Sequence, residues 1–391
     1  MNTSSNTSGF TRHGFLALGL ACLLVLAGLV VFVCVLPSQK TADQSLEYGY
    51  VQSSAKSESV AFTRAAAHGD TYFLFGSSEL TTLPNMVSSV PDRVFQEYDC
   101  GMQFMYIGDA YDQSLWLAIA AGAYAQDMPN KEVAIIVSPQ WFYDGGLEQG
   151  IFKMRFSYNL YQHFCENGRI SPETKAYVAA RLIDEGVDGA LIDGGDPEMF
   201  QDYLNRAAFL AMSDFKLRQA LGQCRARGVP RQAPSTPPNF DALRQQVQAE
   251  AQMWCTNNEW GIFDAYWSEH IEPDFEMRKG TLATETLTKT SEYDDLSCFL
   301  AVCKESGLEP YVVVAPVNGF WYDHVGLSAG VRHTFYERVE TLCADAGVAC
   351  LNMAAHEYEL YYLRDSMHMG WLGWIDIEEG FMEFARKEHA E

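Results

Sequence analysis

The chain has 391 residues, 48% of them apolar and 20% charged, a globular composition that suffices for one large domain or for one domain with an insertion. Its formal net charge of −24 argues against nucleic-acid binding and against a large basic surface for anionic lipid headgroups. A polyanionic ligand would need a local cationic patch, and the sequence does not locate one.

The first predicted element is a transmembrane helix over residues 15–36. Phe15 to Leu36 carries no charge, and at about 1.5 Å per residue it reaches roughly 33 Å, enough for a hydrocarbon core of about 30 Å. The alternatives are a buried core helix and a cleaved signal peptide, whose apolar region is usually only about 7–15 residues long. We expect a cytoplasmic tail at 1–14, an uncleaved anchor, a stalk and lead-in helix at 37–69, and an extracytoplasmic domain at 70–391.

A buried strand is predicted at Thr71–Phe75, and it stops at the tight turn Gly76-Ser77-Ser78. Ligands bind outside the carboxyl ends of strands in an open α/β sheet, so a hydroxyl placed there faces a crevice. Chemistry alone does not choose between Ser77 and Ser78. The Gly-x-Ser-x-Gly elbow is absent, because Leu80 stands where its second glycine would be. An isolated Gly-Ser-Ser is more often a turn or a helix cap.

Two further strands are predicted at 102–107 and 133–137, each ending in a polar turn. Gly108 follows the first strand, and Gln140 lies just after the second. Each could present an N–H donor to a developing oxyanion. A glycine helix cap and an ordinary loop glutamine fit the pattern equally well.

A helical insertion is predicted at about 150–279, placed over the sheet as a lid or a partner surface. The α/β pattern then resumes with a helix at 292–307, a strand at 311–314, a helix at 331–346 and a strand at 348–351. A last helix follows to the end of the chain. Strands that alternate with helices indicate a mainly parallel sheet covered on both faces.

Ten cysteines are present, two of them in the predicted span. The other eight permit disulfides in an extracytoplasmic domain, and Cys343 with Cys350 is a weak suggestion for one pair. No CxxC or Cys/His metal spacing occurs, so we predict no metal site and no cofactor.

A carboxylate and an imidazole stand three residues apart in Asp365-Ser366-Met367-His368. A serine hydroxyl is a weak nucleophile, so acyl transfer needs a base within hydrogen-bond reach and a group that holds this base in the right tautomer. We therefore predict a serine acyl-transfer site in which His368 is the base and Asp365 orients it. The prediction requires that two stretches far apart in the chain meet in one cleft.

Several motifs, in order along the chain, carry a resemblance to a known family. Behind the N-terminal span they are Phe75–Leu80, Ser138–Phe142, Glu292–Leu296, Pro316–Tyr322 and Asp365–Trp371. Together they resemble DltD, the D-alanyl-lipoteichoic acid biosynthesis protein of Gram-positive bacteria, over nearly the whole length. That family is similar to the SGNH, or GDSL-like, hydrolases, which implies an α/β three-layer domain with a mainly parallel sheet.

The resemblance also implies roles for individual residues. Placing Gly76-Ser77-Ser78 on the Gly-Asp-Ser block of SGNH hydrolases makes Ser78 the nucleophile, and residues 365–368 match their Asp-x-x-His block. The backbone N–H groups of Ser78 and Gly108 would bind the oxyanion. Gln140 falls where those hydrolases use an asparagine. Ser77 in place of their aspartate and Gln140 in place of the asparagine are departures from the superfamily.

The function implied by the resemblance is esterification of teichoic acid with D-alanine outside the cell. Ser78 would accept the D-alanyl group as an ester and pass it to a hydroxyl of the polyglycerol-phosphate chain. The implied partners are a membrane-bound O-acyltransferase and a D-alanyl carrier protein, or a donor derived from it, with lipoteichoic acid as substrate. Two alternatives remain: an esterase or thioesterase of the same class, and a non-catalytic scaffold for the D-alanylation machinery.

Overall fold

The computed structural model describes residues 12–35, 41–81, 85–192, 213 and 215–388, and the chain divides into two units, 1–40 and 41–391. In the first unit α1 covers Arg12–Val35. Among the helices that these described residues form, none combines the length and the apolar character needed to cross a membrane. The predicted span at 15–36 is therefore not supported by the structure, and most of the predicted tail at 1–14 lies outside the described residues.

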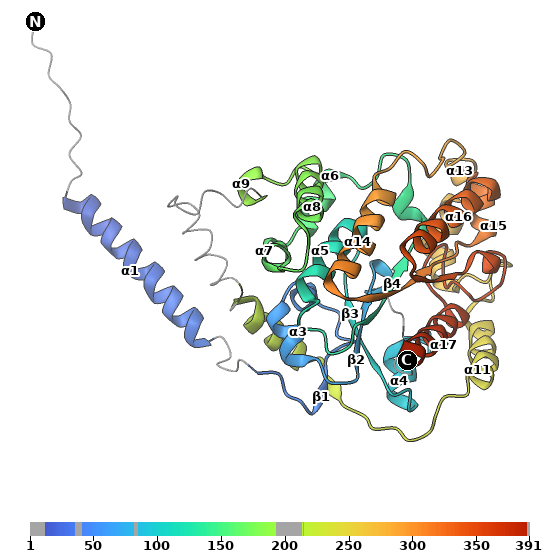
Figure 1. The fold of residues 1–391 in the computed structure, drawn as a ribbon, viewed down its shortest axis with the longest axis horizontal. Coiled ribbons are helices and arrows are strands. Elements are labelled where there is room, and N and C mark those ends of the chain that lie inside the picture. Colours follow the sequence, from blue (N-terminus) through green and yellow to red (C-terminus); the bar gives the residue numbers. More distant parts are fainter. Residues whose placement is uncertain (1–11, 36–40, 82–84, 193–212, 214, 389–391) are drawn as a thin grey trace, which may run out of the picture. The chain divides into compact units, whose positions relative to one another are not determined.

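The second unit is built on a five-stranded parallel sheet with the strand order β3-β2-β4-β6-β7 (Figure 1). The strands cover the segments in which the sequence predicts them, with ends shifted by one or two residues. They are β2 (Thr71–Phe75), β3 (Gln103–Ile107), β4 (Glu132–Val137), β6 (Glu309–Val314) and β7 (Ala349–Asn352).

Both faces of the sheet are buried, as the continuous apolar runs predict. Every residue of β2 is buried. Phe73 and Phe75 belong to the core on one face, whereas Tyr72 and Leu74 belong to the core on the other. This alternation follows from the period of two along a strand, and it makes the domain a three-layer structure.

The first face is covered by a layer of helices in which α5 packs on both α14 and α7. The helices that contribute to this core are α3 (Val60–Ala66), α5 (Ser114–Tyr124), α6 (Gln149–Arg155), α7 (Tyr158–Glu166), α8 (Pro172–Asp184), α9 (Gly189–Ile192), α14 (Glu292–Ser306), α15 (Gly319–Val325) and α16 (Ala329–Ala346).

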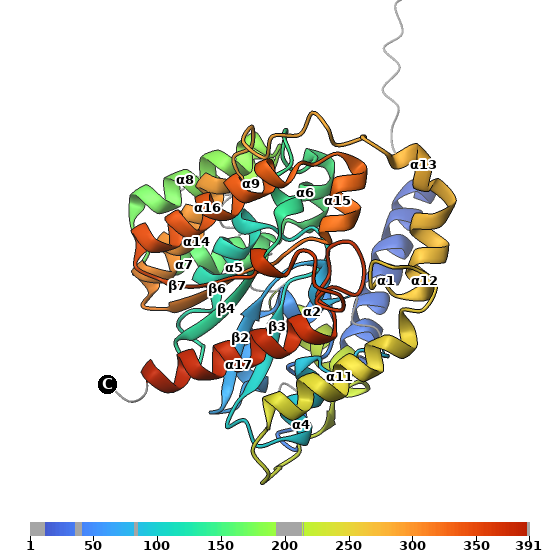
Figure 2. The same cartoon turned by 90° about the vertical axis from the view of Figure 1, so that its right-hand side faces the viewer.

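The second face is covered by α4 (Pro91–Glu97), α11 (Phe240–Trp254) and α17 (Trp371–Glu388). Figure 2 shows α17 lying along this face with α11 beside it, and the two helices are in contact. The helices between 149 and 278 are therefore divided between the layers: α6 to α9 join the first face and α11 joins the second.

The remaining elements are short. A two-stranded antiparallel ribbon pairs β1 (Leu46–Glu47) with β5 (Val229–Pro230); the sequence does not predict it, because two residues are too few to show a period. The others are α2 (Ser54–Ser57), η1 (Ser78–Leu80), η2 (Pro139–Phe142), α12 (Asp264–Tyr266), the π-helical η3 (Trp267–Ile271), η4 (Glu272–Asp274), α13 (Phe275–Arg278) and η5 (Ala354–His356).

The strand order creates a crevice between β2 and β4. Within the sheet β2 comes first in the chain, and its neighbours are the second and third strands, β3 and β4. The connections therefore leave in opposite directions from this point, and ligands bind outside the carboxyl ends of the strands at such a reversal. The turns that contain Ser78 and Gln140 both begin there.

The suggested pairing of Cys343 with Cys350 is not a disulfide in the structure. The described cysteines are free thiols. Cys343 in α16 and Cys350 in β7 lie side by side, and the hydrogen bond that the Cys343 thiol donates to the Cys350 sulfur, with burial, raises the pKa of Cys343 above its ordinary value. The sequence spacing indicated proximity but not oxidation.

Candidate active site

Ser78, His368 and Asp365 form one line of hydrogen bonds. Ser78 Oγ lies 2.8 Å from His368 Nε2, and His368 Nδ1 lies 2.8 Å from Asp365 Oδ2. Asp365 is fully buried, whereas 15% of the His368 side chain is exposed. The two stretches that the sequence singles out, almost three hundred residues apart, therefore meet at the carboxyl edge of the sheet.

The Asp365–His368 loop is held by its own backbone. Leu363 pairs with Met369 in an antiparallel bridge, and the Arg364 N–H donates to the His368 carbonyl at 3.0 Å. Asp365 Oδ1 accepts from the N–H groups of Met367 and His368 at 2.9 and 2.8 Å, which leaves Oδ2 for the imidazole. One carboxylate thus shapes the loop and orients the imidazole at the same time.

Asp365 is an ionised carboxylate inside the protein. Burial by itself would raise the pKa of Asp365, but the charge and hydrogen bonds of His368, together with the Arg364 guanidinium, hold this pKa at about 2. Arg364 Nη1 lies 3.3 Å from Asp365 Oδ2. The negative charge is therefore present at any pH at which His368 can act as a base.

Asn318 ties the loop to α15, and sequence reasoning did not single it out beyond its motif. Its backbone N–H donates to the Ser366 carbonyl at 3.0 Å. Its side-chain oxygen caps α15 by accepting from the Trp321 N–H, and its amide nitrogen donates to the Trp260 carbonyl. An asparagine before a helix is a capping signal that the sequence shows, whereas the contact with Ser366 could be identified only in the fold.

The structure distinguishes the two adjacent serines. Ser77 is 2% exposed, and its hydroxyl donates to the Asp109 carbonyl at 3.4 Å, so it faces away from the imidazole. The Ser77 N–H donates to Glu79 Oε1 at 2.6 Å. Glu79 is buried beneath the turn, and this burial raises its pKa. Ser78 is thus the serine presented to His368.

Gly108 stands against the serine turn, and only glycine fits there. Its φ is +130°, and a Cβ would lie 1.8 Å from the Gly76 carbonyl oxygen. Its N–H donates to the buried Ser57 hydroxyl at 3.3 Å. Gly108 is therefore next to the turn, and in this structure its N–H has a protein partner.

Gln140 follows β4 in η2. Its side-chain oxygen accepts from the Ser138 hydroxyl at 2.7 Å, an arrangement that turns the amide nitrogen away from Ser138. An amide nitrogen so oriented is a donor available for another acceptor. The sequence identified this residue by position, but not the serine that holds it.

One motif behind the resemblance has a structural task. Glu292 accepts from the N–H of Ser114, the first residue of α5, at 2.9 Å, and burial raises its pKa to about 8. Asp295 binds Arg181 and Tyr177. These carboxylates join α14 to α5 and α8 and do not take part in the triad.

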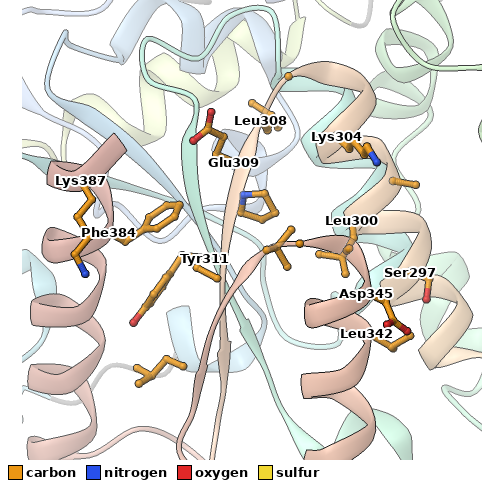
Figure 3. Close-up of a pocket in the computed structure, with 18 of the residues that line it drawn as sticks. Ser297, Leu300, Lys304, Leu308, Glu309, Tyr311, Leu342, Asp345, Phe384 and Lys387 are labelled. Carbon is orange, nitrogen blue, oxygen red and sulfur yellow. The ribbon is translucent and has the colours of Figure 1, made fainter. Parts of the chain in front are cut away.

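Two cavities differ in their relation to the Asp365–His368 loop. A cavity of about 250 Å³ is lined by Ser366 and Met367 of the Asp365–His368 loop, although Ser78, Asp365 and His368 themselves do not line it. A larger one of about 1220 Å³ lies at the amino ends of β6 and β7, the opposite end of the sheet, and no residue of the Asp365–His368 loop lines it. Figure 3 shows it between Tyr311, Phe384 and Leu300. The smaller cavity is thus the one of the two that adjoins the Asp365–His368 loop.

The described residues contain no group of three or more His, Cys, Asp or Glu side chains that could hold a metal ion. A parallel α/β sheet with a serine, a histidine and an aspartate aligned at its crevice has the arrangement by which hydrolases and acyltransferases activate a serine.

Comparison with known proteins identifies the family. A family model described as "DltD protein" matches residues 49–386. Similar proteins include Protein DltD of Bacillus subtilis (strain 168), 25% identical over 324 residues (80% of this chain and 81% of the relative). Protein DltD of Staphylococcus aureus is 23% identical over 324 residues, 81% of each chain. Protein DltD of Lacticaseibacillus rhamnosus is 23% identical over 336 residues, 81% of this chain and 77% of the relative. The chain belongs to the DltD family, whose place is in the D-alanylation of teichoic acids.

Proposed function

We propose that this chain is a serine-dependent D-alanyl acyltransferase with an SGNH-hydrolase-like site. The observation that carries the proposal is the aligned set Ser78, His368 and Asp365, with 2.8 Å at both steps. These are the distances that proton transfer from a hydroxyl to an imidazole requires.

In the first half-reaction Ser78 Oγ attacks the carbonyl carbon of a D-alanyl ester or thioester, and His368 Nε2 takes the hydroxyl proton. Asp365 stabilises the imidazolium that forms. His368 then gives the proton to the leaving alcohol or thiol, and the D-alanyl group stays on Ser78 as an ester. In the second half-reaction a teichoic acid hydroxyl attacks this ester, His368 takes its proton, and Ser78 is regenerated.

The developing oxyanion needs donors, and the N–H groups of Ser78 and Gly108 with the Gln140 amide are the candidates. The Ser57 hydroxyl now accepts from Gly108 at 3.3 Å. We propose that this long bond gives way when a negatively charged oxygen arrives, because a charged acceptor binds an N–H more strongly than a neutral one. The Ser138 hydroxyl donates a hydrogen bond to the oxygen of the Gln140 side chain. The amide nitrogen of Gln140 therefore stays available to donate to the oxyanion.

The proposed acceptor places the chain in the cell envelope, where teichoic acid lies. The donor would come through a membrane-bound O-acyltransferase partner and a D-alanyl carrier protein. The single-pass anchor rests on the uncharged run 15–36, its cytoplasmic N-terminus rests on the short tail ahead of that run, and both stay sequence predictions.

The test separates transfer from its two rivals. The full chain is treated with a fluorophosphonate probe and, separately, with a D-alanyl thioester and a poly(glycerol phosphate) acceptor. We expect labelling of the wild type and of Ser77→Ala but not of Ser78→Ala, and D-alanine esters on the acceptor. Free D-alanine as the only product would make the chain a hydrolase. An unlabelled wild type would make it a scaffold.

A further inference from the structure

The cavity of about 250 Å³ beside the Asp365–His368 loop, here called the Arg278 pocket, is formed by four parts of the chain, one of which is α15 with Trp321, Tyr322 and Val325. The catalytic loop contributes two residues, the segment after η2 one, and the α12–α13 region, visible in Figure 2, most of the opposite wall. The residues that matter for the argument are Ser366, Met367, Tyr143, Tyr266, His270 and Arg278.

Arg278 is the cation of this pocket, and it has no ion-pair or hydrogen-bond partner for its guanidinium among the described residues. Its side chain is exposed. Three buried or half-buried arginines are instead neutralised by carboxylates: Arg364 by Asp365, Arg332 by Glu357 and Arg155 by Asp112. In a chain with 27 basic and 51 acidic residues, Arg278 thus places a positive charge without a carboxylate partner in the pocket beside Ser366 and Met367.

Tyr266 connects Arg278 to the reacting groups. Burial raises the pKa of Tyr266, and the Asp365 charge adds to this, whereas the Ser366 hydroxyl and the guanidiniums of Arg364 and Arg278 lower it. The Tyr266 hydroxyl is thus close to both the catalytic loop and Arg278. The His270 ring lies against the Tyr266 ring with 4.9 Å between centroids.

The side chains of the pocket favour a ligand with a negative charge. A guanidinium without a carboxylate partner attracts an anion and disfavours an ammonium group, so the D-alanyl amine fits poorly. The planar fork of arginine matches two oxygens of a phosphate. The aromatic rings of the pocket walls suit the short carbon segments between phosphates.

We propose that the Arg278 pocket binds a phosphodiester group of the acceptor polymer and thereby places the neighbouring glycerol hydroxyl at the Ser78 ester. This inference rests on the proposed acyl transfer and adds to it the group that recognises the acceptor. It also supplies the local cationic patch that a polyanionic substrate requires on a strongly acidic protein.

The test compares a charged and a neutral acceptor. With a D-alanyl thioester as donor, transfer to a synthetic glycerol phosphate oligomer and to glycerol is measured for the full-length wild type, Arg278→Gln, Arg278→Lys and the control Lys279→Gln. Lys279 is also exposed but does not line the pocket. Loss of a charged hydrogen bond is worth about 1.5–3 kcal/mol, or roughly 10–100-fold.

We expect Arg278→Gln to raise KM for the oligomer by about this factor, with little change in kcat and a smaller effect with glycerol. The KM of Arg278→Lys for the oligomer should lie between those of the wild type and Arg278→Gln. The KM of Lys279→Gln should match that of the wild type. Equal losses with both acceptors, or none with the oligomer, would overturn the inference while leaving the proposed function in place.

Binding without turnover gives a second readout. Calorimetric titration of the oligomer into Ser78→Ala should show binding that weakens as salt rises, and the double variant Ser78→Ala with Arg278→Gln should lose most of it. Unchanged binding in the double variant would refute the pocket assignment even if the wild type proves to have no transferase activity. Far-UV circular dichroism and thermal unfolding show whether each variant is folded.

Discussion

Asp365→Asn tests the claim that one buried carboxylate both shapes the catalytic loop and orients the base. The substituted amide can still accept at Oδ1 from the N–H groups of Met367 and His368. In place of Oδ2 it has an NH₂ group, which cannot accept the proton on His368 Nδ1. The imidazole must therefore rotate or change tautomer, and its Nε2 no longer accepts from Ser78.

The structure gives two magnitudes. The loss of a triad orienter by this route costs about 10⁴-fold in turnover, or about 5.5 kcal/mol in the barrier. The pKa of Asp365 is about 2 against an ordinary 3.8, and at about 1.4 kcal/mol per pH unit this is about 2 kcal/mol of folding free energy. Because the folded-state pKa is lowered, this stability is present above pH 4 and is lost as the pH falls toward 2.

Two assays follow from these numbers. The rate of fluorophosphonate labelling of Ser78 should fall by about four orders of magnitude in Asp365→Asn. Urea unfolding should show a deficit of about 2 kcal/mol at pH 7 that shrinks as the pH approaches 2. Asp376→Asn is the control, because Asp376 is likewise a hydrogen-bonded carboxylate, accepting from the Tyr362 hydroxyl, but lies on α17 and does not contact His368. Near-normal labelling of Asp365→Asn would refute the reasoning.

Three further substitutions test the scaffold. Gly108→Ala should destabilise the serine turn, because its Cβ would lie 1.8 Å from the Gly76 oxygen at a φ that costs about 1–3 kcal/mol; an unchanged melting temperature with normal labelling would contradict this. Glu378 is fully buried in α17, both its oxygens lack a partner among the described residues, and burial raises its pKa. A raised carboxyl pKa makes wild-type stability fall as the pH rises above 4.5, so Glu378→Met should add about 1–3 kcal/mol at pH 8 and less at pH 5, and a lower melting temperature at pH 8 would count against it. Arg332 is fully buried against Glu357 and Asp323, so Arg332→Met should cost about 3–5 kcal/mol in urea unfolding, and a loss below 1 kcal/mol would be inconsistent.

The sheet could be predicted from the sequence because buried parallel strands are continuous apolar runs with glycine or polar turns behind them. Thr71–Phe75 and the run at 133–137 are too short for a typical buried helix, so a strand is the favoured assignment for both. The β1–β5 ribbon could not be predicted, since two-residue strands carry no pattern. The partition of the insertion between the two faces depends on contacts such as α11 with α17, which no local signal encodes.

The candidate site divides in the same way. Asp365 and His368 could be found together, because a three-residue offset puts both on one loop. Choosing Ser78 over Ser77 needed either the resemblance or the geometry, since adjacent serines are equivalent as residue types. Two hydrogen-bond partners support the site: Asn318, which binds the Asp365–His368 loop, and Ser57, which binds Gly108. Both are distant in sequence from the residues they bind, so they could be identified only in the fold.

The proposed function is tested most directly by finding where the D-alanyl group resides. The full chain is incubated with a D-alanyl thioester without acceptor, quenched in acid, digested and examined by mass spectrometry. The account predicts a D-alanyl adduct on Ser78 in the wild type and in Ser77→Ala, which disappears when the glycerol phosphate oligomer is added. An adduct on Ser77, or D-alanine esters formed on the oligomer by Ser78→Ala, would contradict it.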